Sequence, residues 1–147
     1  MSVVDDSILK ANYQTKITVP YADIDMLGHV NNARYLTYFE IVRTEAIYSH
    51  RAMSDPKSIG IIIARAEIDY KSPARWRDEL TVKMRTSHVG NSSWTSDYEI
   101  TNEKENNKLV ATGKTVQVAF DYAKGKPVPI PQELKTKLLK EVEESRE

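Results

Sequence analysis

Residues 21–40 have the sequence YADIDMLGHVNNARYLTYFE, in which turn-forming and polar residues pass directly into an apolar periodicity. Residues 21–32 hold two aspartates, a glycine, a histidine and two asparagines, a composition typical of a tight loop. A helix is predicted over residues 32–50, because apolar side chains recur there at spacings of three and four residues. Asn31 or Asn32 would cap its first turn by accepting a hydrogen bond from a backbone N–H group. The apolar positions of the predicted helix are Tyr35, Leu36, Phe39, Val42, Ala46 and Ile47.

The chain on either side of this helix has the pattern of strands. Residues 13–19 alternate polar and apolar side chains before a proline, as a half-buried strand does. The run IGIIIA at residues 59–64 is apolar on both faces, so its strand is expected to lie centrally in the sheet. Short connections rich in Pro, Gly and Asn favour antiparallel pairing. The strands predicted after the helix cover residues 59–70, 80–89, 93–101 and 109–120.

The order of elements predicts a single α+β domain over residues 1–147: a curved antiparallel sheet of about five strands around one long helix. Residues 1–12 show no period and are expected to form a loose terminus. The charged tail, residues 132–147, is predicted to be a short helix of low stability. One helix cannot cover both faces of such a sheet. The other face or an edge strand is therefore expected to need a partner chain, which favours an oligomer.

Composition excludes several classes of function. Lys and Arg number 21 and Asp and Glu number 21, so the basic surplus of a general nucleic-acid binder is missing. There is no cysteine, and the three histidines have no metal-ligand spacing, so neither a metal nor a redox cofactor is expected. The five glycines form no nucleotide-binding loop. No apolar run could span a membrane and no signal peptide is recognisable, so a cytoplasmic protein is expected.

The densest cluster of reactive side chains lies directly before the helix: Asp23, Asp25, His29, Asn31 and Asn32. The first turn of a helix has N–H groups without an intrahelical acceptor, and these can polarise a carbonyl and hold an oxyanion. A nearby carboxylate can attack that carbonyl or take a proton from a water molecule. The alternative is structural: a capped helix whose aspartates close turns.

The same stretch, residues 21–40, resembles the signature of the acyl-CoA thioesterases related to 4-hydroxybenzoyl-CoA thioesterase. The resemblance implies the hotdog fold, in which a sheet wraps a long helix. It also implies hydrolysis of an acyl-CoA or acyl-carrier-protein thioester without a cofactor, in a homodimer or homotetramer. Further matches are DYKSP at 69–73, DEL at 78–80, GNSSW at 90–94, VAF at 118–120 and PVPIP at 127–131.

The resemblance assigns roles to the residues that match its motif. Asp25 falls where the family has its catalytic carboxylate, which acts as nucleophile or as general base. Asn32 occupies the helix-start position whose backbone N–H binds the thioester carbonyl. His29 matches a histidine that, in similar plant acyl-carrier-protein thioesterases, acts with an asparagine two residues earlier, where this chain has Leu27. Arg77 stands where the family more often has glycine.

The substrate side of the site is predicted from two regions. Tyr35, Tyr38 and Phe39 could border the acyl pocket, although aromatic residues at helical spacing are usually core. Asn31, before the helix, is a further candidate for substrate binding. Asn91, Ser92 and Ser93 match a strand start that lines the CoA groove in similar proteins.

Two charged groups have open interpretations. Arg75 and Arg77 beside Trp76 could meet the phosphates and adenine of CoA, or form an ordinary charged turn. Glu40 lies three residues before Arg43, so an ion pair is expected rather than a catalytic role. The alternatives to a thioesterase are a hotdog hydratase or dehydratase, or an acyl-CoA-binding protein without activity.

Overall fold

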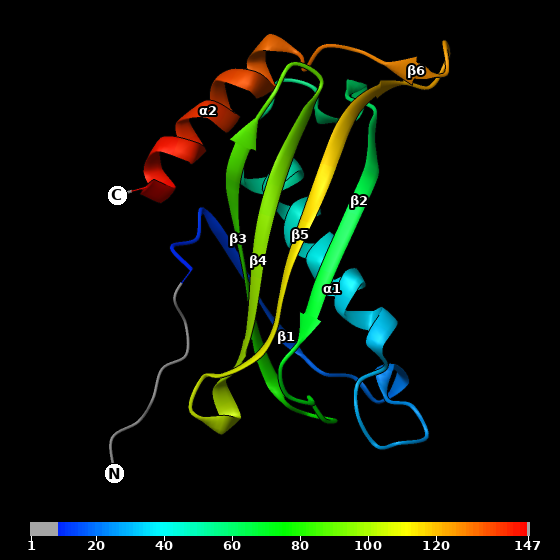
Figure 1. Ribbon diagram of the computed structural model, residues 1–147, viewed down its shortest axis with the longest axis vertical. Coiled ribbons are helices and arrows are strands. Elements are labelled where there is room, and N and C mark those ends of the chain that lie inside the picture. The colour runs from blue at the N-terminus through cyan, green and yellow to red at the C-terminus, as the bar shows by residue number, and fades with distance from the viewer. Residues whose placement is uncertain (1–8, 147) are drawn as a thin grey trace.

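The computed structural model describes residues 9–146, and its elements lie close to the predicted bounds. None of its helices is long and apolar enough to cross a membrane within that range. The strands are β1 (Tyr13–Thr18), β2 (Ile61–Tyr70), β3 (Glu79–Val89), β4 (Ser93–Asn102), β5 (Lys108–Asp121) and the short β6 (Lys126–Pro127). The helices are α1 (Asn32–Glu45), which continues as a π-helical turn (Ala46–His50), and α2 (Gln132–Arg146) (Figure 1).

The strands form one antiparallel sheet in the order β1-β3-β4-β5-β2, with β6 paired to the end of β5. The central helix α1 lies along one face of this sheet (Figure 1). The predicted architecture, a curved antiparallel sheet wrapped around one long helix, is confirmed.

The predicted central position of residues 59–64 is wrong. Within residues 9–146, β2 is an edge strand whose one partner in the sheet is β5. Ile63, in this strand, remains 43% exposed. The apolar pattern of a strand reports how apolar its two faces are, and it carries no information about how many strands flank it.

The core lies between α1 and the inner face of the sheet. Phe39 stacks on Tyr98 of β4 with ring centroids 4.3 Å apart, and a Cβ on Gly113 would collide with the Phe39 ring. The absence of a side chain at Gly113 therefore lets the helix approach the sheet. Within the predicted apolar stripe, Leu36 is 39% exposed, whereas Tyr38, outside the stripe, is buried.

A second core cluster forms where α2 closes the end of the sheet, around Trp94, Leu134 and Leu138. This helix is anchored by a buried ion pair: Nε and Nη2 of Arg51 each donate to the Glu141 carboxylate at 2.9 Å. The charge pattern of the tail did not indicate such an anchor. The N-terminal residues 1–12 were expected to be loose, and residues 1–8 of them lie outside the described range. Residue 147 also lies outside it. Asn12 is held by Glu141 and the backbone of β3.

Candidate active site

Asp25 lies in a closed loop, and its backbone and side chain both form hydrogen bonds that hold this loop. Its N–H donates to the carbonyl of His29 at 3.0 Å, and its carbonyl accepts the N–H of Gly28 at 3.0 Å. Gly28 has a φ of +83°, which glycine adopts without steric penalty. The Leu27 N–H donates to Oδ1 of Asp25 at 2.9 Å. The carboxylate is thus oriented by the turn that follows it.

The second carboxylate oxygen of Asp25 is available to a ligand. Among residues 9–146, Oδ2 accepts no hydrogen bond and forms no ion pair, and the side chain is half-buried. A carboxylate held through one oxygen and open at the other can act as a nucleophile or as a base.

The first turn of α1 leaves one N–H group without an acceptor. Asn31 is the N-cap: its Oδ1 accepts the N–H of Ala33 at 3.0 Å, and its carbonyl accepts that of Arg34 at 2.9 Å. The N–H of Asn32, the first helical residue, has no acceptor within the described part of the chain. Of the two caps that the sequence allowed, the structure uses Asn31, and the free donor belongs to Asn32.

Asp23 has a structural environment that distinguishes it from Asp25. Its Oδ2 accepts the hydroxyl of Tyr38 at 2.7 Å, and its Oδ1 lies 3.5 Å from Nε of Arg34. Burial raises the pKa of Tyr38 above its ordinary value, and the hydrogen bond to Asp23 raises it further. The carbonyl of Asp23 also accepts the N–H of Asn31. Asp23 therefore holds the loop against the helix, as the structural alternative predicted.

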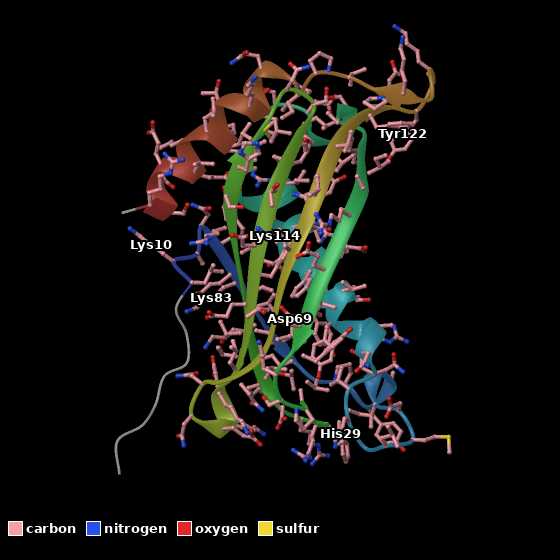
Figure 2. All side chains as sticks on the ribbon, viewed as in Figure 1. Lys10, His29, Asp69, Lys83, Lys114 and Tyr122 are labelled. Carbon is pink, nitrogen blue, oxygen red and sulfur yellow. The ribbon has the colours of Figure 1, made fainter. Side chains whose placement is uncertain are left out.

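The other predicted site residues of this region differ in accessibility. The side chain of His29 is half-buried at the lower end of the molecule and makes no hydrogen bond with residues 9–146 (Figure 2). Tyr35 is 3% exposed, and its hydroxyl accepts the N–H of Ala74 at 3.3 Å. In a single chain Tyr35 thus belongs to the core.

The predicted groove residues lie far from this loop in one chain. Asn91 and Ser92 lie in the turn between β3 and β4, and Ser93 is the first residue of β4, at the opposite end of the sheet from the Asp25 loop (Figure 1). The carbonyls of Asn91 and Ser92 accept the N–H groups of Ile130 and Ala119, at 2.9 and 2.8 Å. Asp25 and His29 lie in one closed loop, and Asn31 and Asn32 form the helix start that follows it. Residues 91–93 lie apart from them.

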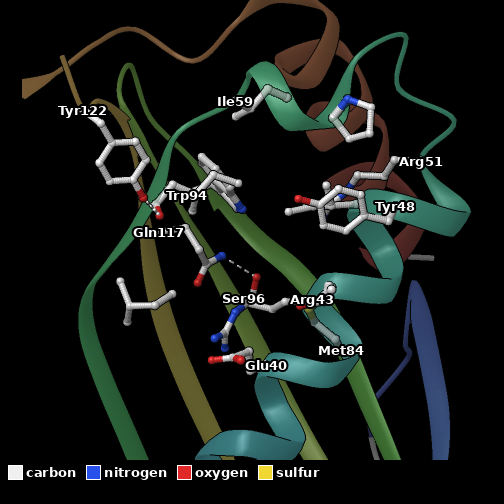
Figure 3. A pocket seen from close by; sticks show the side chains of 15 residues that line it. Glu40, Arg43, Tyr48, Arg51, Ile59, Met84, Trp94, Ser96, Gln117 and Tyr122 are labelled. Carbon is white, nitrogen blue, oxygen red and sulfur yellow. Dashed lines mark hydrogen bonds between the residues drawn. The ribbon is translucent and has the colours of Figure 1, made fainter.

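A cavity of about 330 Å³ lies between the second half of α1 and the inner face of the sheet (Figure 3). Its wall combines aliphatic side chains with polar groups, and the amide of Gln117 is hydrogen-bonded to Oγ of Ser96 at 2.8 Å. Sequence analysis missed this cavity, although polar residues at helix-facing positions of β4 and β5 were a signal for it. Lining residues from both sides include Glu40, Arg43, Ile47, Ile61, Ile63, Ser96 and Gln117.

The ion pair expected between Glu40 and Arg43 is not formed. Nη1 of Arg43 donates to the hydroxyl of Tyr98 at 3.1 Å, and Glu40 has no ion pair among residues 9–146. The inner face of the sheet offered Arg43 a buried acceptor that the helix sequence alone did not reveal. Over the same range, no three His, Asp or Glu side chains are grouped so that they could hold a metal ion.

Comparisons with known proteins place the chain in a family and agree with its fold. The family model of the thioesterase-like superfamily matches residues 19–138. YsmA of Bacillus subtilis, an uncharacterised protein, is 32% identical over 128 residues, 87% of this chain and 86% of that protein. The acyl-CoA thioesterase YbgC of Haemophilus influenzae is 29% identical over 133 residues, 87% of this chain and 95% of that enzyme. The crystal structure of a thioesterase from Thermus thermophilus, complexed with coenzyme A and zinc, has a TM-score of 0.78 at 30% identity and covers 90% of this chain and 96% of that one.

Proposed function

The chain belongs to the thioesterase-like superfamily, and on that premise we propose that it hydrolyses an acyl-CoA thioester to a free carboxylic acid and CoA. The observation that carries the proposal is that one loop–helix junction holds two groups without a partner among residues 9–146. These are Oδ2 of Asp25 and the N–H of Asn32.

The two groups suit the two requirements of thioester hydrolysis. The Asn32 N–H polarises the thioester carbonyl and stabilises the oxyanion that forms on its oxygen. In one route Asp25 takes a proton from water, the hydroxide adds to the carbonyl carbon, and the C–S bond breaks to release the CoA thiolate, which then takes up a proton. In the other, Asp25 itself displaces the thiolate to form a mixed anhydride, which water hydrolyses to the acid and the free carboxylate.

The exposed edge of β2 supports an assembly in which two chains complete the site. β2 carries an apolar run but has one strand neighbour in the described part of the chain, so its outer edge can pair with the β2 of a second copy. A twofold axis makes such pairing antiparallel, and the start of one β2 then lies beside the end of the other. A homodimer, or a homotetramer built from such dimers, follows.

This pairing would bring the separated parts of the site together. The end of β2 holds the helix start, because the Tyr70 hydroxyl donates to the carbonyl of Asn32. The beginning of β2 lines the cavity through Ile61 and Ile63. In the dimer, the Asp25 loop of one chain approaches the cavity and the β3–β4 turn of the other. The acyl group would then enter that cavity, with residues 91–93 lining the path of the CoA arm.

The reaction is tested by thiol release from short, long and aromatic acyl-CoAs, comparing the wild type with Asp25→Asn. We expect turnover of at least one substrate and a loss of roughly a hundredfold or more in the variant. Asp121→Asn is the matched control, because Asp121 also accepts backbone N–H groups two and three residues ahead in an exposed turn. Addition of water to an enoyl-CoA without thiol release would instead indicate a hydratase, and binding without turnover an acyl-CoA-binding protein.

The two-chain site is tested by mixing inactive variants. Glu40→Trp fills the cavity from an exposed position, and Asp25→Asn removes the carboxylate. After the two chains are unfolded together and refolded, mixed dimers carry one intact site, so about a quarter of wild-type activity returns. If no activity returns, the whole site lies within one chain and the two-chain proposal is wrong. Light scattering must also give a mass of twice or four times 16.8 kDa.

A further inference from the structure

The turn between β2 and β3 has an arginine where the backbone favours glycine. The carbonyl of Arg75 accepts the N–H of Asp78 at 3.0 Å, so Trp76 and Arg77 are the two central residues of a β-turn. Arg77 has a φ of +69°. A positive φ at the second central position is the mark of a turn that selects glycine or asparagine, and a longer side chain there is strained.

The arginine side chain is not needed to form this turn. Oδ2 of Asp78 accepts the N–H of Arg75 at 2.8 Å and the Nδ2 amide of Asn102 at 2.9 Å. The N–H of Arg77 donates to the carbonyl of Val19 at 3.0 Å, a bond that any residue except proline would make. The backbone conformation is therefore held by other groups, and glycine at position 77 would relieve strain without losing a contact of the turn.

The guanidinium of Arg77 instead forms an exposed platform with two aromatic rings. It lies 4.1 Å from the ring centroid of Trp76, and the Trp76 ring meets Tyr21 edge-on at 5.5 Å. Trp76 is 48% exposed and Tyr21 is 72% exposed. Arg77 has no carboxylate partner among residues 9–146, whereas Arg75 lies 3.9 Å from Glu105. The platform, defined as Tyr21, Trp76 and Arg77, thus presents a planar, unpaired cation beside large aromatic faces.

The platform is connected to the Asp25 loop through the backbone on both sides. Tyr21 opens the short 3-10 turn Tyr21–Asp23 that leads into this loop. On the other side, the N–H of Val30 donates to the carbonyl of Ala74 at 2.8 Å, just before the turn. The connection between β2 and β3 and the loop that carries His29 both lie at the lower end of the molecule (Figures 1 and 2).

We propose that this platform binds the adenosine 3′,5′-bisphosphate end of CoA, so that the carrier of the acyl group is CoA rather than an acyl carrier protein. The inference rests on the proposed thioesterase function. An exposed indole offers a stacking surface for adenine, and a planar guanidinium binds phosphate through two parallel N–H groups. Such a role accounts for a strained arginine at a position that glycine would occupy at lower cost.

The first test measures nucleotide binding without any reaction. Adenosine 3′,5′-bisphosphate is titrated against the protein while tryptophan fluorescence is recorded; Trp94 is 2% exposed, so a change reports on Trp76. We expect saturable quenching in the wild type and a dissociation constant roughly tenfold higher in Arg77→Gly, with part of the affinity restored in Arg77→Lys. Lys140→Gln on α2 removes one positive charge elsewhere and should bind as the wild type does. Equal affinity in Arg77→Gly and the wild type would overturn the proposal.

The second test compares an acyl-CoA with the same acyl group on pantetheine, which lacks the nucleotide. In the wild type KM is lower for the CoA ester, and Arg77→Gly reduces this advantage roughly tenfold, while Lys140→Gln preserves it. If the wild type hydrolyses both esters with equal KM, or prefers an acyl carrier protein, the nucleotide site is wrong although the thioesterase function stands. If it hydrolyses no thioester, the proposed function fails, and the quenching titration still decides whether the platform binds the nucleotide.

Discussion

The hydroxyl of Tyr70 donates a hydrogen bond of 3.0 Å to the carbonyl oxygen of Asn32, and this contact joins the last residue of β2 to the first residue of α1. The helix start that carries the free N–H is thereby fixed to the edge of the sheet. A substitution that removes this hydrogen bond is therefore expected to alter the position of the helix start at the candidate site.

Tyr70→Phe removes this bond and keeps the ring that packs edge-on against Tyr35. We expect the free energy of unfolding to fall by about 1 kcal/mol, the usual contribution of one hydrogen bond. Because the start of α1 is no longer held to β2 by this bond, kcat should fall several-fold, although the reaction still takes place. Urea unfolding and steady-state kinetics on the same preparation measure both effects, and an unchanged kcat would separate this bond from the site.

Asn32→Pro deletes the proposed oxyanion donor without removing a helical hydrogen bond. Proline is favoured at the first helical position, and the preceding residue, Asn31, already has the extended conformation that proline requires, with φ −60° and ψ 138°. We expect kcat to fall by roughly a hundredfold or more at nearly unchanged stability. Asn32→Ala is the matched control, because it retains the N–H and should retain most of the activity. Similar rates in both variants would exclude this N–H from catalysis.

Glu141→Gln tests the anchor of α2. The side chains of Arg51 and Glu141 are 3% and 5% exposed, so the variant leaves a buried guanidinium charge without its counterion. We expect a loss of about 3–5 kcal/mol in the free energy of unfolding. The double variant Arg51→Met, Glu141→Leu removes both charges and should lose less than Glu141→Gln alone. Urea unfolding followed by the fluorescence of the buried Trp94 reports on this end of the molecule.

The raised pKa of Tyr38 predicts that the free energy of unfolding falls at alkaline pH. Its pKa in the folded chain is raised above the ordinary 10.0, first by burial and then by its hydrogen bond to Asp23. Above about pH 10 the unfolded chain therefore loses this proton before the folded chain does, and the free energy of unfolding falls as pH rises. Burial raises the pKa of Tyr13 as well and acts in the same direction. Urea unfolding from about pH 8 to about pH 11 should show a shallower decline for Tyr38→Phe than for the wild type.

The sequence determined those features that depend on neighbours along the chain. The helix over residues 32–50 and the strands followed from periodicity, because side-chain spacing reports backbone geometry directly. The proximity of Asp25 to the start of α1 was predictable for the same reason, since only the six residues of a tight loop lie between Asp25 and Asn32. Asp23 and Asp25 were already distinguished by the resemblance, and the structure supplies a physical basis for the difference.

Only the tertiary structure decided which distant residues meet. It placed β2 at the edge of the sheet, paired Arg43 with Tyr98 instead of Glu40, and put residues 91–93 at the end of the sheet opposite Asp25. It also brought Arg51 to Glu141, 90 positions along the chain. These contacts depend on how the sheet closes around the helix, which is set by the packing of all elements at once. A local pattern of apolar and polar side chains specifies which face of a helix or strand is buried. Which other element packs against that face is decided only when all the elements come together in the fold.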